Sequence, residues 1–479
     1  MKKSIKNLLK TDYSVLCMSI TIGSSVFAQQ YSEGKPNMLL ILSDDHSYPY
    51  LGCYGNPDLK TPNIDRIAKE GIRFDRAYTT APQSVPSRAS IMTGRNVLDV
   101  QMLRFTAPLD KDIVTGPEIL RGNGYYTGLC GRTYHLDGPD GPKETLEAFA
   151  EYEMVTFPKR VDYVKNGMKT VELFSEFLDR VPKGKPFFMQ ACFSDPHRPF
   201  TAKDYEPDPT KIKVPEGFPD TKLLRQDLAA YYGEIQRLDE QVGLLLKELE
   251  KRGLEKNTLV VFMGDNGASL LRGKGTLYEC GIHVPFVAKW PGIIKPGSIT
   301  NILASGEDLV PTFLEAAGIA PTKEMTGQSF YPVLKGDNIS GREYVFAVRG
   351  AHGSALPDKS TGAFDLSRCV FNKKFKLIYN PLYYLYYQPI DCARDPFWKD
   401  LIEKNNNGLV EPRFSGTVLF SPERPRFELF DLENDPNEFV NLYGKEDYKE
   451  IEYQLKKVLQ KWMIRYRDVV PLPILPVGK

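Results

Sequence analysis

The segment from residue 81 to residue 95 carries a dense set of side chains that could do chemistry. It reads Ala-Pro-Gln-Ser-Val-Pro-Ser-Arg-Ala-Ser-Ile-Met-Thr-Gly-Arg. Pro86 is typical of a helix start, because its missing N–H would be unpaired there. We therefore expect Ser84 to lie just before a helix N-terminus, where free N–H groups and the dipole favour an anion. Arg88 can turn back toward Ser84, although a serine in this position can also be a simple N-cap.

Pairs of polar residues follow three apolar runs of the sequence. In an open α/β sheet, ligands bind beyond the carboxyl ends of the strands, so these pairs are predicted to share one rim. Carboxylate and amide oxygens suit Ca²⁺ or Mg²⁺. Such residues can also serve as turn and N-cap residues, but pairs that directly follow buried strands favour a metal. The pairs are Asp44 with Asp45, Asp195 with His197, and Asp265 with Asn266, of which Asp195 is interpreted as a turn residue.

The pattern as a whole resembles the type I sulfatases of the alkaline phosphatase superfamily. Their signature is Cys or Ser, any residue, Pro, Ser and Arg, followed by a helix of small residues and Thr-Gly-Arg. Residues 84–88 and 93–95 match it throughout. The resemblance extends over about residues 36 to 466. Further family-like segments are 44–45, 61–65, 264–267, 274–279, 308–314 and 429–436.

The resemblance implies a nucleophile that is made after translation. A bare serine hydroxyl is a weak nucleophile, and in this family the residue at the position of Ser84 is oxidised to formylglycine. One hydroxyl of the hydrated aldehyde attacks sulfur, an alcohol or amine leaves, and the second hydroxyl then expels sulfate. The resemblance also implies one Ca²⁺ per chain. Its implied ligands are Asp44, Asp45, Asp265, Asn266 and the modified Ser84.

The resemblance also implies roles for the basic residues and the histidines of the site. Arg88 would hold the diol oxygen, and Lys274 would contact the sulfate and stabilise developing charge. His197 would protonate the leaving group, and His135 would take the proton of the second hydroxyl. Arg132 stands where most of the family has Lys, with one extra residue before His135. A guanidinium can replace an ammonium as a fixed charge, although its geometry differs.

Softer matches resemble the heparan N-sulfatases (sulfamidases). Residues 193–198 read Phe-Ser-Asp-Pro-His-Arg, the step from Asn266 to Lys274 is short, and residues 227–232 and 389–398 also look alike. The lead substrate is therefore N-sulfoglucosamine of heparin or heparan sulfate. The alternative is an O-sulfatase acting on a 6-O-sulfated amino sugar or an aryl sulfate. A phosphoester or phosphonate hydrolase of the same superfamily and a non-catalytic glycan-binding protein are less favoured.

A sheet must position these residues, and the sequence contains the pattern of one. Residues 37–42, 186–193 and 257–263 are short, continuously apolar runs, typical of parallel strands buried on both faces. Apolar residues repeat at steps of three and four from Leu228 to Leu249, which predicts a helix with Gly253 after its end. Residues 171–178 behave similarly. We expect an α/β fold with a large, mainly parallel or mixed sheet sandwiched by helices, as in alkaline phosphatase-like proteins.

The pattern changes near residue 340. Short candidate strands lie at 344–348, 369–371 and 375–379, a loop-rich stretch runs over 395–425, and a helical pattern covers 451–466. These features predict a smaller C-terminal α+β subdomain at 341–479, packed against a catalytic domain at 36–340.

The N-terminus predicts export to the periplasm or the medium. Lysines at positions 2 to 10 precede a mostly apolar stretch over 13–27, and Val-Phe-Ala at 26–28 fits signal cleavage. Residues 1–28 are therefore a predicted signal peptide. No other stretch is apolar enough to span a bilayer.

The net charge of the 479-residue chain limits which classes of partner are expected. The net charge of +1 gives no global field toward nucleic acid or a membrane. The expected partners are a sulfated saccharide and, by resemblance, a serine-type, anaerobic enzyme that makes formylglycine. Six cysteines remain after signal cleavage, without metal-binding spacing, and are expected to be buried thiols. A disulfide between Cys369 and Cys392 is left open.

Overall fold

The computed structural model describes residues 34–105, 108–133, 135, 143–151, 157–352 and 359–474. The predicted signal peptide lies outside these ranges. Residues 36–479 form one compact unit. The predicted boundary near residue 340 falls between the two main sheets of that unit, and it stays a prediction.

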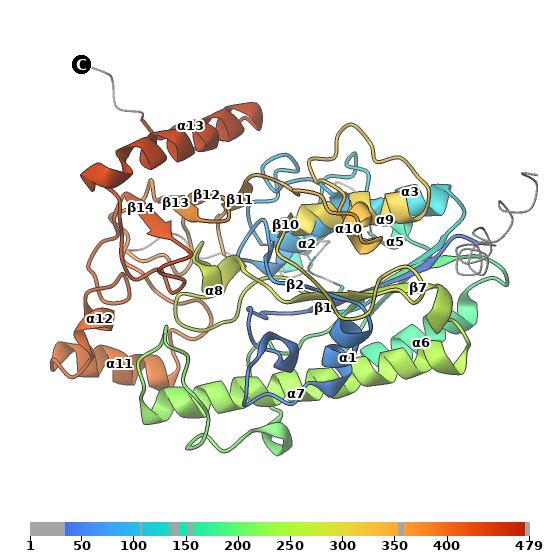
Figure 1. The fold of residues 1–479 in the computed structure, drawn as a ribbon, viewed down its shortest axis with the longest axis horizontal. Helices are drawn as coiled ribbons and strands as arrows, with labels where there is room; N and C mark the ends of the chain where they lie inside the picture. The colour runs from blue at the N-terminus through green and yellow to red at the C-terminus, as the bar shows by residue number, and fades with distance from the viewer. Residues whose placement is uncertain are drawn as a thin grey trace, which may run out of the picture. The chain divides into compact units, whose positions relative to one another are not determined.

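A large, mostly parallel sheet forms the centre of the fold (Figure 1). Its strand order is β5-β4-β6-β1-β7-β8-β2-β9, and β8 runs antiparallel to both of its neighbours. The three predicted runs become β1, β6 and β7, which are adjacent and parallel. The strands are β1 (Asn37–Ser43), β2 (Ile72–Phe74), β4 (Tyr126–Gly131), β5 (Tyr163–Asn166), β6 (Phe187–Cys192), β7 (Thr258–Gly264), β8 (Phe286–Lys289) and β9 (Ser298–Thr300).

The central strand β1 is buried on both faces, as its continuous apolar run predicts. Leu39 and Ile41 pack into one core cluster, whereas Met38, Leu40 and Leu42 pack into a second. Alternate side chains of a strand point to opposite faces, so β1 contributes to both cores at once.

Helices cover both faces of this sheet (Figure 1). The first face carries α1 (Pro62–Glu70), α6 (Thr170–Arg180) and α7 (Lys222–Lys251). The second carries α2 (Ser84–Thr93), α3 (Gly116–Gly122) and α9 (Leu309–Ala316). The shorter helices are α4 (Lys143–Glu151), α5 (Phe157–Arg160), α8 (Glu279–Ile282) and α10 (Tyr331–Leu334), and 3-10 turns lie at Gly52–Tyr54, Lys203–Tyr205, Glu255–Asn257, Gly306–Asp308 and Glu446–Tyr448.

The C-terminal region builds a second, antiparallel sheet in the order β11-β12-β13-β14. Helix α13 (Lys449–Arg465) packs on it through Leu455, Leu459 and Met463. The predicted strands and the last helix are confirmed in this α+β arrangement. The strands are β11 (Val345–Val348), β12 (Arg368–Phe371), β13 (Phe375–Tyr379) and β14 (Phe427–Asp431), and a further pair, β3 (Ala77–Tyr78) and β10 (Ala304–Ser305), lies apart from both main sheets.

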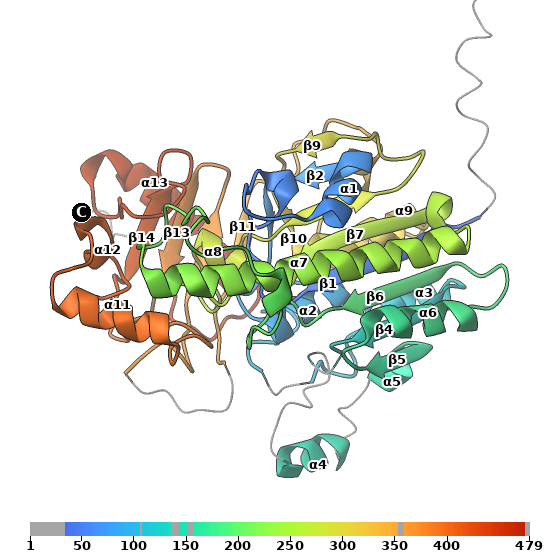
Figure 2. The ribbon, with the colours of Figure 1, turned by 90° about the horizontal axis from the view of Figure 1, so that it is seen from below.

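The stretch predicted to be loop-rich, 395–425, contains two helices, so that prediction is wrong in part. Helix α11 (Pro396–Asn406) begins with a proline in its first turn and buries Phe397, Trp398 and Leu401 against the core that α7 lines. Figure 2 shows α7 running along the sheet toward α11. The second helix is α12 (Pro412–Ser415).

Two further features of the described residues bear on location and redox state. All six cysteines that they include are free, so Cys369 and Cys392 form no disulfide here. No helix among them has both the length and the apolar character needed to cross a membrane.

Candidate active site

The carboxyl ends of three adjacent strands deliver the predicted polar residues to one place. Asp44 follows β1, Asp265 follows β7, and His197 lies just beyond β6. The backbone N–H of Asp45 donates to the Asp265 Oδ1 atom at 3.0 Å, which ties the ends of β1 and β7 together. Asp45 has a φ of 61°, a left-handed conformation that costs about 1–3 kcal/mol at a residue with a side chain.

Ser84 is the first residue of α2 rather than the residue before it, which corrects the predicted helix start. Gln83 is the extended residue that precedes the helix, with φ −151° and ψ 138°. Pro86 then occupies the third helical position, where a backbone N–H would still have no partner within the helix. The Ser84 side chain is nevertheless held at the N-terminus of α2, as the sequence predicts.

Oxygen atoms surround the Ser84 hydroxyl. The Ser84 Oγ atom donates to Asn266 Oδ1 at 2.9 Å and lies 3.1 Å from Asp44 Oδ1. The Asn266 amide in turn donates to Asp45 Oδ1 at 2.8 Å. Asp44, Asp45, Asp265, Asn266 and Ser84 are all fully buried.

Arg88 compensates part of this buried negative charge. Its Nε atom donates to Asp265 Oδ2 at 2.8 Å, and its Nη2 atom donates to Asp44 Oδ2 at 3.1 Å. Burial opposes a charged guanidinium, but the two carboxylates raise the pKa of Arg88 above its ordinary value. Arg88 therefore stays charged and fixes both carboxylates beside Ser84.

The carboxylates still repel one another. Burial and the neighbouring Asp44 raise the pKa of Asp265 to about 6, although Arg88 opposes the shift. Burial and Asp44 also raise the pKa of Asp45 to about 7 against the pull of Lys274. Ligand atoms of Asp44, Asp265 and His135 lie close enough to bind one ion, and so do those of Asp44, Asp45 and His197. The carboxylate oxygens of these groups, whose charge is only partly compensated, fit a hard divalent cation.

Lys274 and His197 lie beside Asp45. The Lys274 Nζ atom is 2.9 Å from Asp45 Oδ2 and 3.1 Å from His197 Nε2. The His197 Nδ1 atom is hydrogen-bonded to the Arg198 carbonyl, which assigns the proton of the neutral ring to Nδ1 and leaves Nε2 as the acceptor. Burial and the Lys274 ammonium lower the pKa of His197 to about 4.

Arg132 and His135 lie on the other side of Asp44. The Arg132 Nη1 atom is 3.2 Å from Asp44 Oδ2, and the His135 Nδ1 atom is 3.7 Å from the same oxygen. Burial holds the pKa of His135 well below its usual value, although Asp44 opposes this shift. The structure thus brings together all ten residues that the sequence singles out for the site, in spite of the extra residue between Arg132 and His135.

Two further residues border the site. The sequence places Asp391 in the sulfamidase-like segment 389–398 without giving it a role, and it leaves His352 as a structural or substrate-adjacent residue. The Asp391 Oδ2 atom is 2.7 Å from Lys274 Nζ, and the His352 Nε2 atom is 3.7 Å from Asp391 Oδ1. Both come from loops of the C-terminal region and stand in no metal or nucleophile motif. The scarcity of histidine, with five in the chain, was the one signal that could have drawn attention to His352.

The other histidines and Asp195 have structural contacts. His46 is buried and hydrogen-bonded to Ser43 and to the Tyr50 carbonyl. His283 pairs with Glu279 at 2.9 Å and stacks on an aromatic ring. Asp195 pairs with Arg237 at 2.8 Å rather than facing Ser84, in agreement with its interpretation as a turn residue.

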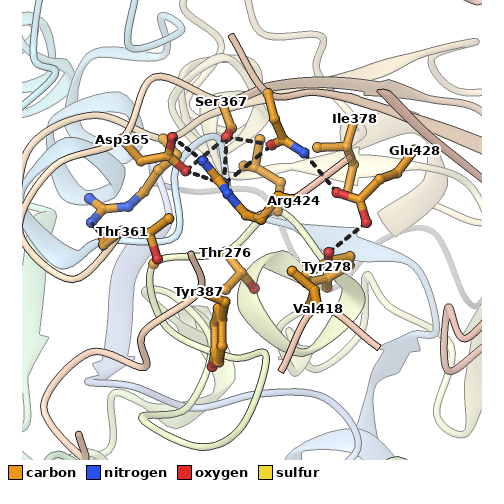
Figure 3. Close-up of a pocket in the computed structure, with 14 residues that line it drawn as sticks. Thr276, Tyr278, Thr361, Asp365, Ser367, Ile378, Tyr387, Val418, Arg424 and Glu428 are labelled. Atoms are coloured by element: carbon orange, nitrogen blue, oxygen red, sulfur yellow. Dashed lines mark hydrogen bonds and ion pairs between the residues drawn. The ribbon is translucent and has the colours of Figure 1, made fainter. Parts of the chain in front are cut away.

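The loop that carries Lys274 rests on a buried polar network of the C-terminal sheet (Figure 3). Tyr278 donates to Glu428 at 2.6 Å, and Glu428 accepts from Asn380 at 2.8 Å. Arg424 lies at the centre of the network and pairs with Asp365 at 2.7 Å. These groups line a cavity of about 20 Å³, which is room for a single water molecule.

The sequence of the chain is similar to those of known sulfatases. The family model described as "Sulfatase" matches residues 36–319, and the model described as "N-sulphoglucosamine sulphohydrolase, C-terminal" matches residues 270–397. An ulvan-active sulfatase of Formosa agariphila is 31% identical over 91% of this chain and 81% of its own length. The human N-sulphoglucosamine sulphohydrolase is 28% identical over 90% of each chain.

Among solved structures, BT4656 in complex with its substrate D-glucosamine-2-N,6-O-disulfate has a similar fold. The TM-score is 0.66 at 22% identity, and the likeness covers 91% of this chain and 99% of that one. The large mixed sheet with covering helices and the small C-terminal sheet are thus an arrangement shared with known proteins.

Proposed function

The chain belongs to the sulfatase family, and from that membership we propose that it removes sulfate from N-sulfoglucosamine of heparin or heparan sulfate. The observation that carries the choice of substrate is the match of residues 270–397 to the C-terminal model of N-sulphoglucosamine sulphohydrolase. That range includes Lys274, His352 and Asp391, which border the site. The human relative of that name supports the same substrate over nine-tenths of the chain.

A second candidate is an O-sulfated saccharide, such as a 6-O-sulfated amino sugar. The relative with 31% identity is described as active on ulvan, a different polysaccharide from the lead substrate. A phosphoester or phosphonate hydrolase remains the least favoured alternative, because the full signature around Ser84 is that of sulfatases.

Ser84 is proposed to carry the nucleophile after oxidation to formylglycine, which would supply an aldehyde whose hydrate attacks sulfur. Arg88, held by two carboxylates, would orient the attacking oxygen. Lys274 and Arg132 would bind the sulfate oxygens and stabilise the charge that develops on them. His197 would deliver a proton to the leaving atom from Nε2, and His135 would accept the proton of the hydroxyl that remains at residue 84.

The oxygen donors are proposed to hold one Ca²⁺ per chain. Asp44, Asp45, Asp265 and Asn266, with the modified Ser84, would be its ligands. The ion would supply positive charge that polarises the sulfate. The raised pKa values of Asp45 and Asp265 support the assignment, because buried carboxylates shift in this way when a compensating charge is lacking.

Maturation and export complete the proposal. A serine-type, anaerobic formylglycine-generating enzyme would oxidise Ser84, and the predicted signal peptide at 1–28 would direct the chain to the periplasm or the medium. The substrate partner would be a sulfated saccharide of a glycosaminoglycan.

The proposal is tested by co-expressing the chain with such a maturation enzyme under anaerobic conditions. The peptide containing Ser84 should lose two hydrogen atoms in mass, and the protein should release sulfate from glucosamine N-sulfate. Ser84→Ala should abolish release. The matched control is Ser90→Ala on the same helix, because the buried Ser90 Oγ atom has no hydrogen-bond partner among the described residues.

The substrate panel should also include 6-O-sulfated glucosamine, an aryl sulfate and an aryl phosphate. No release from glucosamine N-sulfate by matured protein would discard the lead substrate. Faster hydrolysis of the phosphate than of any sulfate would assign the main activity to the other hydrolases of the superfamily.

A further inference from the structure

A carboxylate from the C-terminal region stands beside the proposed proton donor of the leaving group. The Asp391 Oδ2 atom lies 3.7 Å from His197 Nε2 and 2.7 Å from Lys274 Nζ. Its side chain is 28% exposed, whereas that of Lys274 is 2% exposed. Asp391 is therefore more accessible to solvent than Lys274, and we expect the sugar to approach the site from this side.

Asp391 is held in this position by its own loop. The preceding carbonyl, that of Ile390, accepts a hydrogen bond from Ser269 Oγ at 3.0 Å. A Cβ atom at Gly275 would lie 2.1 Å from Ile390 Cδ1, so the loops that carry Asp391 and Lys274 fit closely together. Asp391 itself has a φ of 63°, a conformation that costs about 1–3 kcal/mol. The carboxylate is thus fixed beside His197.

A negative charge is unexpected at a site that must bind an anionic sulfate. Two like charges 4 Å apart repel by about 4 kcal/mol at an effective dielectric constant of about 20. Asp391 is not the sole counter-charge of Lys274 among the described residues, because Lys274 also pairs with Asp45 at 2.9 Å. Burial would raise the pKa of Asp391, but Lys274 and His352 hold it well below its usual value, so the carboxylate is charged. Its natural complement is a positive charge that forms during the reaction.

The two candidate substrates differ in this respect. In a sulfamate, the nitrogen must take a proton before it can leave, and the protonated nitrogen is positively charged. In a sulfate ester, the leaving oxygen carries at most a partial negative charge, which protonation neutralises. A fixed carboxylate near the leaving atom would stabilise the first transition state and disfavour the second.

We propose that Asp391 is a specificity-determining residue that stabilises the positively charged leaving nitrogen of an N-sulfated amino sugar. The inference rests on the proposed function and deepens it, because it names the group that separates sulfamates from sulfate esters at this site. His352, 3.7 Å from the other oxygen of Asp391, flanks the carboxylate on the side away from Lys274.

The step balances as follows. Sulfur forms a bond to the attacking hydroxyl oxygen at residue 84, which gives up its proton to a neighbouring carboxylate. The sulfur–nitrogen bond breaks with its electron pair remaining on nitrogen. His197, which takes up a second proton on Nε2 from solvent when the anionic substrate binds, transfers that proton to the nitrogen, so the product is a neutral amine. In water near neutral pH this amine takes up a further proton, and Asp391 also complements the resulting ammonium.

The first test compares two substrates in matured enzyme. Asp391→Asn preserves the shape and removes the charge, and we expect it to lower kcat/KM for glucosamine N-sulfate by roughly 10- to 100-fold. Hydrolysis of glucosamine 6-O-sulfate should stay within a few-fold of wild type or increase. The control is Asp400→Asn, which removes a carboxylate of α11 that pairs with Lys404, outside the site. Equal losses on both substrates, or no loss on either, would overturn the proposal.

The second test uses inhibitors and does not depend on turnover of the sulfamate. Glucosamine carries an ammonium and N-acetylglucosamine does not, so wild-type enzyme should be inhibited more strongly by glucosamine. Asp391→Asn should lose that preference while inhibition by inorganic sulfate is retained. If the variant keeps the preference, or if wild type has none, the role of Asp391 is wrong.

Failure of the proposed substrate and failure of the proposed role of Asp391 give different results. Wild-type enzyme that cleaves only O-sulfates would reject the lead substrate. If that enzyme also prefers glucosamine through Asp391, the residue still reads a positive nitrogen, now the free amine of an O-sulfated amino sugar. If it cleaves N-sulfates and Asp391→Asn leaves both substrates equally affected, the lead substrate stands and Asp391 has no role in specificity.

Discussion

The two ring nitrogens of His197 have different environments. Nδ1 is fixed by the Arg198 carbonyl, and Nε2 faces the Lys274 ammonium at 3.1 Å. Because burial and Lys274 lower the pKa of His197 to about 4, the ring is neutral at pH 7 in the substrate-free protein. An anionic substrate that pairs with Lys274 would raise this pKa and favour protonation of Nε2, as the proposed role of proton donor requires.

Replacing His197 should therefore matter most for substrates with poor leaving groups. His197→Gln is expected to lower kcat for glucosamine N-sulfate by about 10²- to 10⁴-fold, the usual contribution of a general acid. Hydrolysis of 4-nitrophenyl sulfate, whose leaving group needs no proton, should fall much less. Steady-state kinetics on the two substrates check this. Equal losses on both would remove His197 from the role of proton donor.

Asp45 and Asp265 should make binding of the proposed calcium ion dependent on pH. Their pKa values are raised to about 7 and about 6, mainly by burial and by the neighbouring Asp44. A cation binds the ionised carboxylates, so protons compete with it as the pH falls through these values. Calcium affinity should accordingly be full near pH 8 and should decline between pH 7 and pH 5.

Calorimetric titration of calcium at several pH values checks this dependence. Asp265→Asn should weaken calcium binding and flatten the pH dependence. Asp75→Asn serves as the control, because Asp75 is a partly exposed carboxylate paired with Arg73. An affinity that does not change between pH 8 and pH 5 would contradict the assignment of these carboxylates as ligands.

The sequence predicted some residues of the site better than others. Asp44 and Asp265 could be found because each directly follows a continuous apolar strand, and Ser84 because it heads a recognisable segment. Asp391 is 117 residues from Lys274 in the chain and reaches it through a loop without a motif. The packing of that loop against Gly275 and the hydrogen bond from Ser269 to the Ile390 carbonyl bring them together, and no local pattern encodes such contacts.

At the scale of elements, the loop from β7 to α8 depends on the C-terminal sheet. Arg272 donates to the Asn437 and Glu438 carbonyls, at 2.6 Å and 2.7 Å, and its guanidinium lies over the Tyr278 ring. Tyr278 then joins the buried network through Glu428. Lys274 therefore owes its position to contacts that span both sheets.

Tyr278→Phe should destabilise the protein by about 1–3 kcal/mol, because it removes one of the two hydrogen-bond donors to the buried Glu428. Thermal unfolding measures the loss. Tyr384→Phe, at a tyrosine that is 60% exposed, should leave the midpoint unchanged. An unchanged midpoint for Tyr278→Phe would show that the network does not hold the loop.

Element prediction succeeded where the pattern was strong. The runs at β1, β6 and β7 are continuous and apolar because both faces of these strands are covered by helices. Helix α11 was missed because its apolar face is only Phe397, Trp398 and Leu401, in a stretch where proline and polar residues dominate. Strand β14 was not predicted as a strand either, since its Phe427–Asp431 segment alternates over too few residues.

At the scale of the whole described unit, the two sheets share their cores. Apolar residues before and after residue 340 pack together in three clusters, so the predicted boundary divides the chain without dividing the packing. The change of pattern near residue 340 revealed the second sheet, but it could not reveal how much apolar surface the sheets bury against each other. One such cluster joins Tyr78, Leu277, Tyr278, Ile282 and Leu303 with Val345, Ala347, Cys369, Phe371, Ile378 and Phe430.

A chain ending at residue 340 should not fold on its own. Each large apolar side chain left exposed forfeits about 1.5–3 kcal/mol, against a total stability of about 5–15 kcal/mol. We expect residues 36–340 to aggregate or to unfold without a cooperative transition, whereas residues 36–479 unfold in a single step. Calorimetry of both proteins decides the matter. A sharp transition in the shorter protein would establish an independent catalytic domain.

The complete burial of Ser84 implies that its proposed oxidation must come before the protein has folded. In the proposed maturation, an enzyme must reach a side chain that, in the folded protein, lies at the N-terminus of α2 beside Asp44 and Asn266. The proposed oxidation would therefore compete kinetically with folding, and a molecule that folds first would stay inactive. The active fraction of any preparation then reports how fast the chain folds after synthesis, and slowing that folding should raise the yield of active enzyme without changing its sequence.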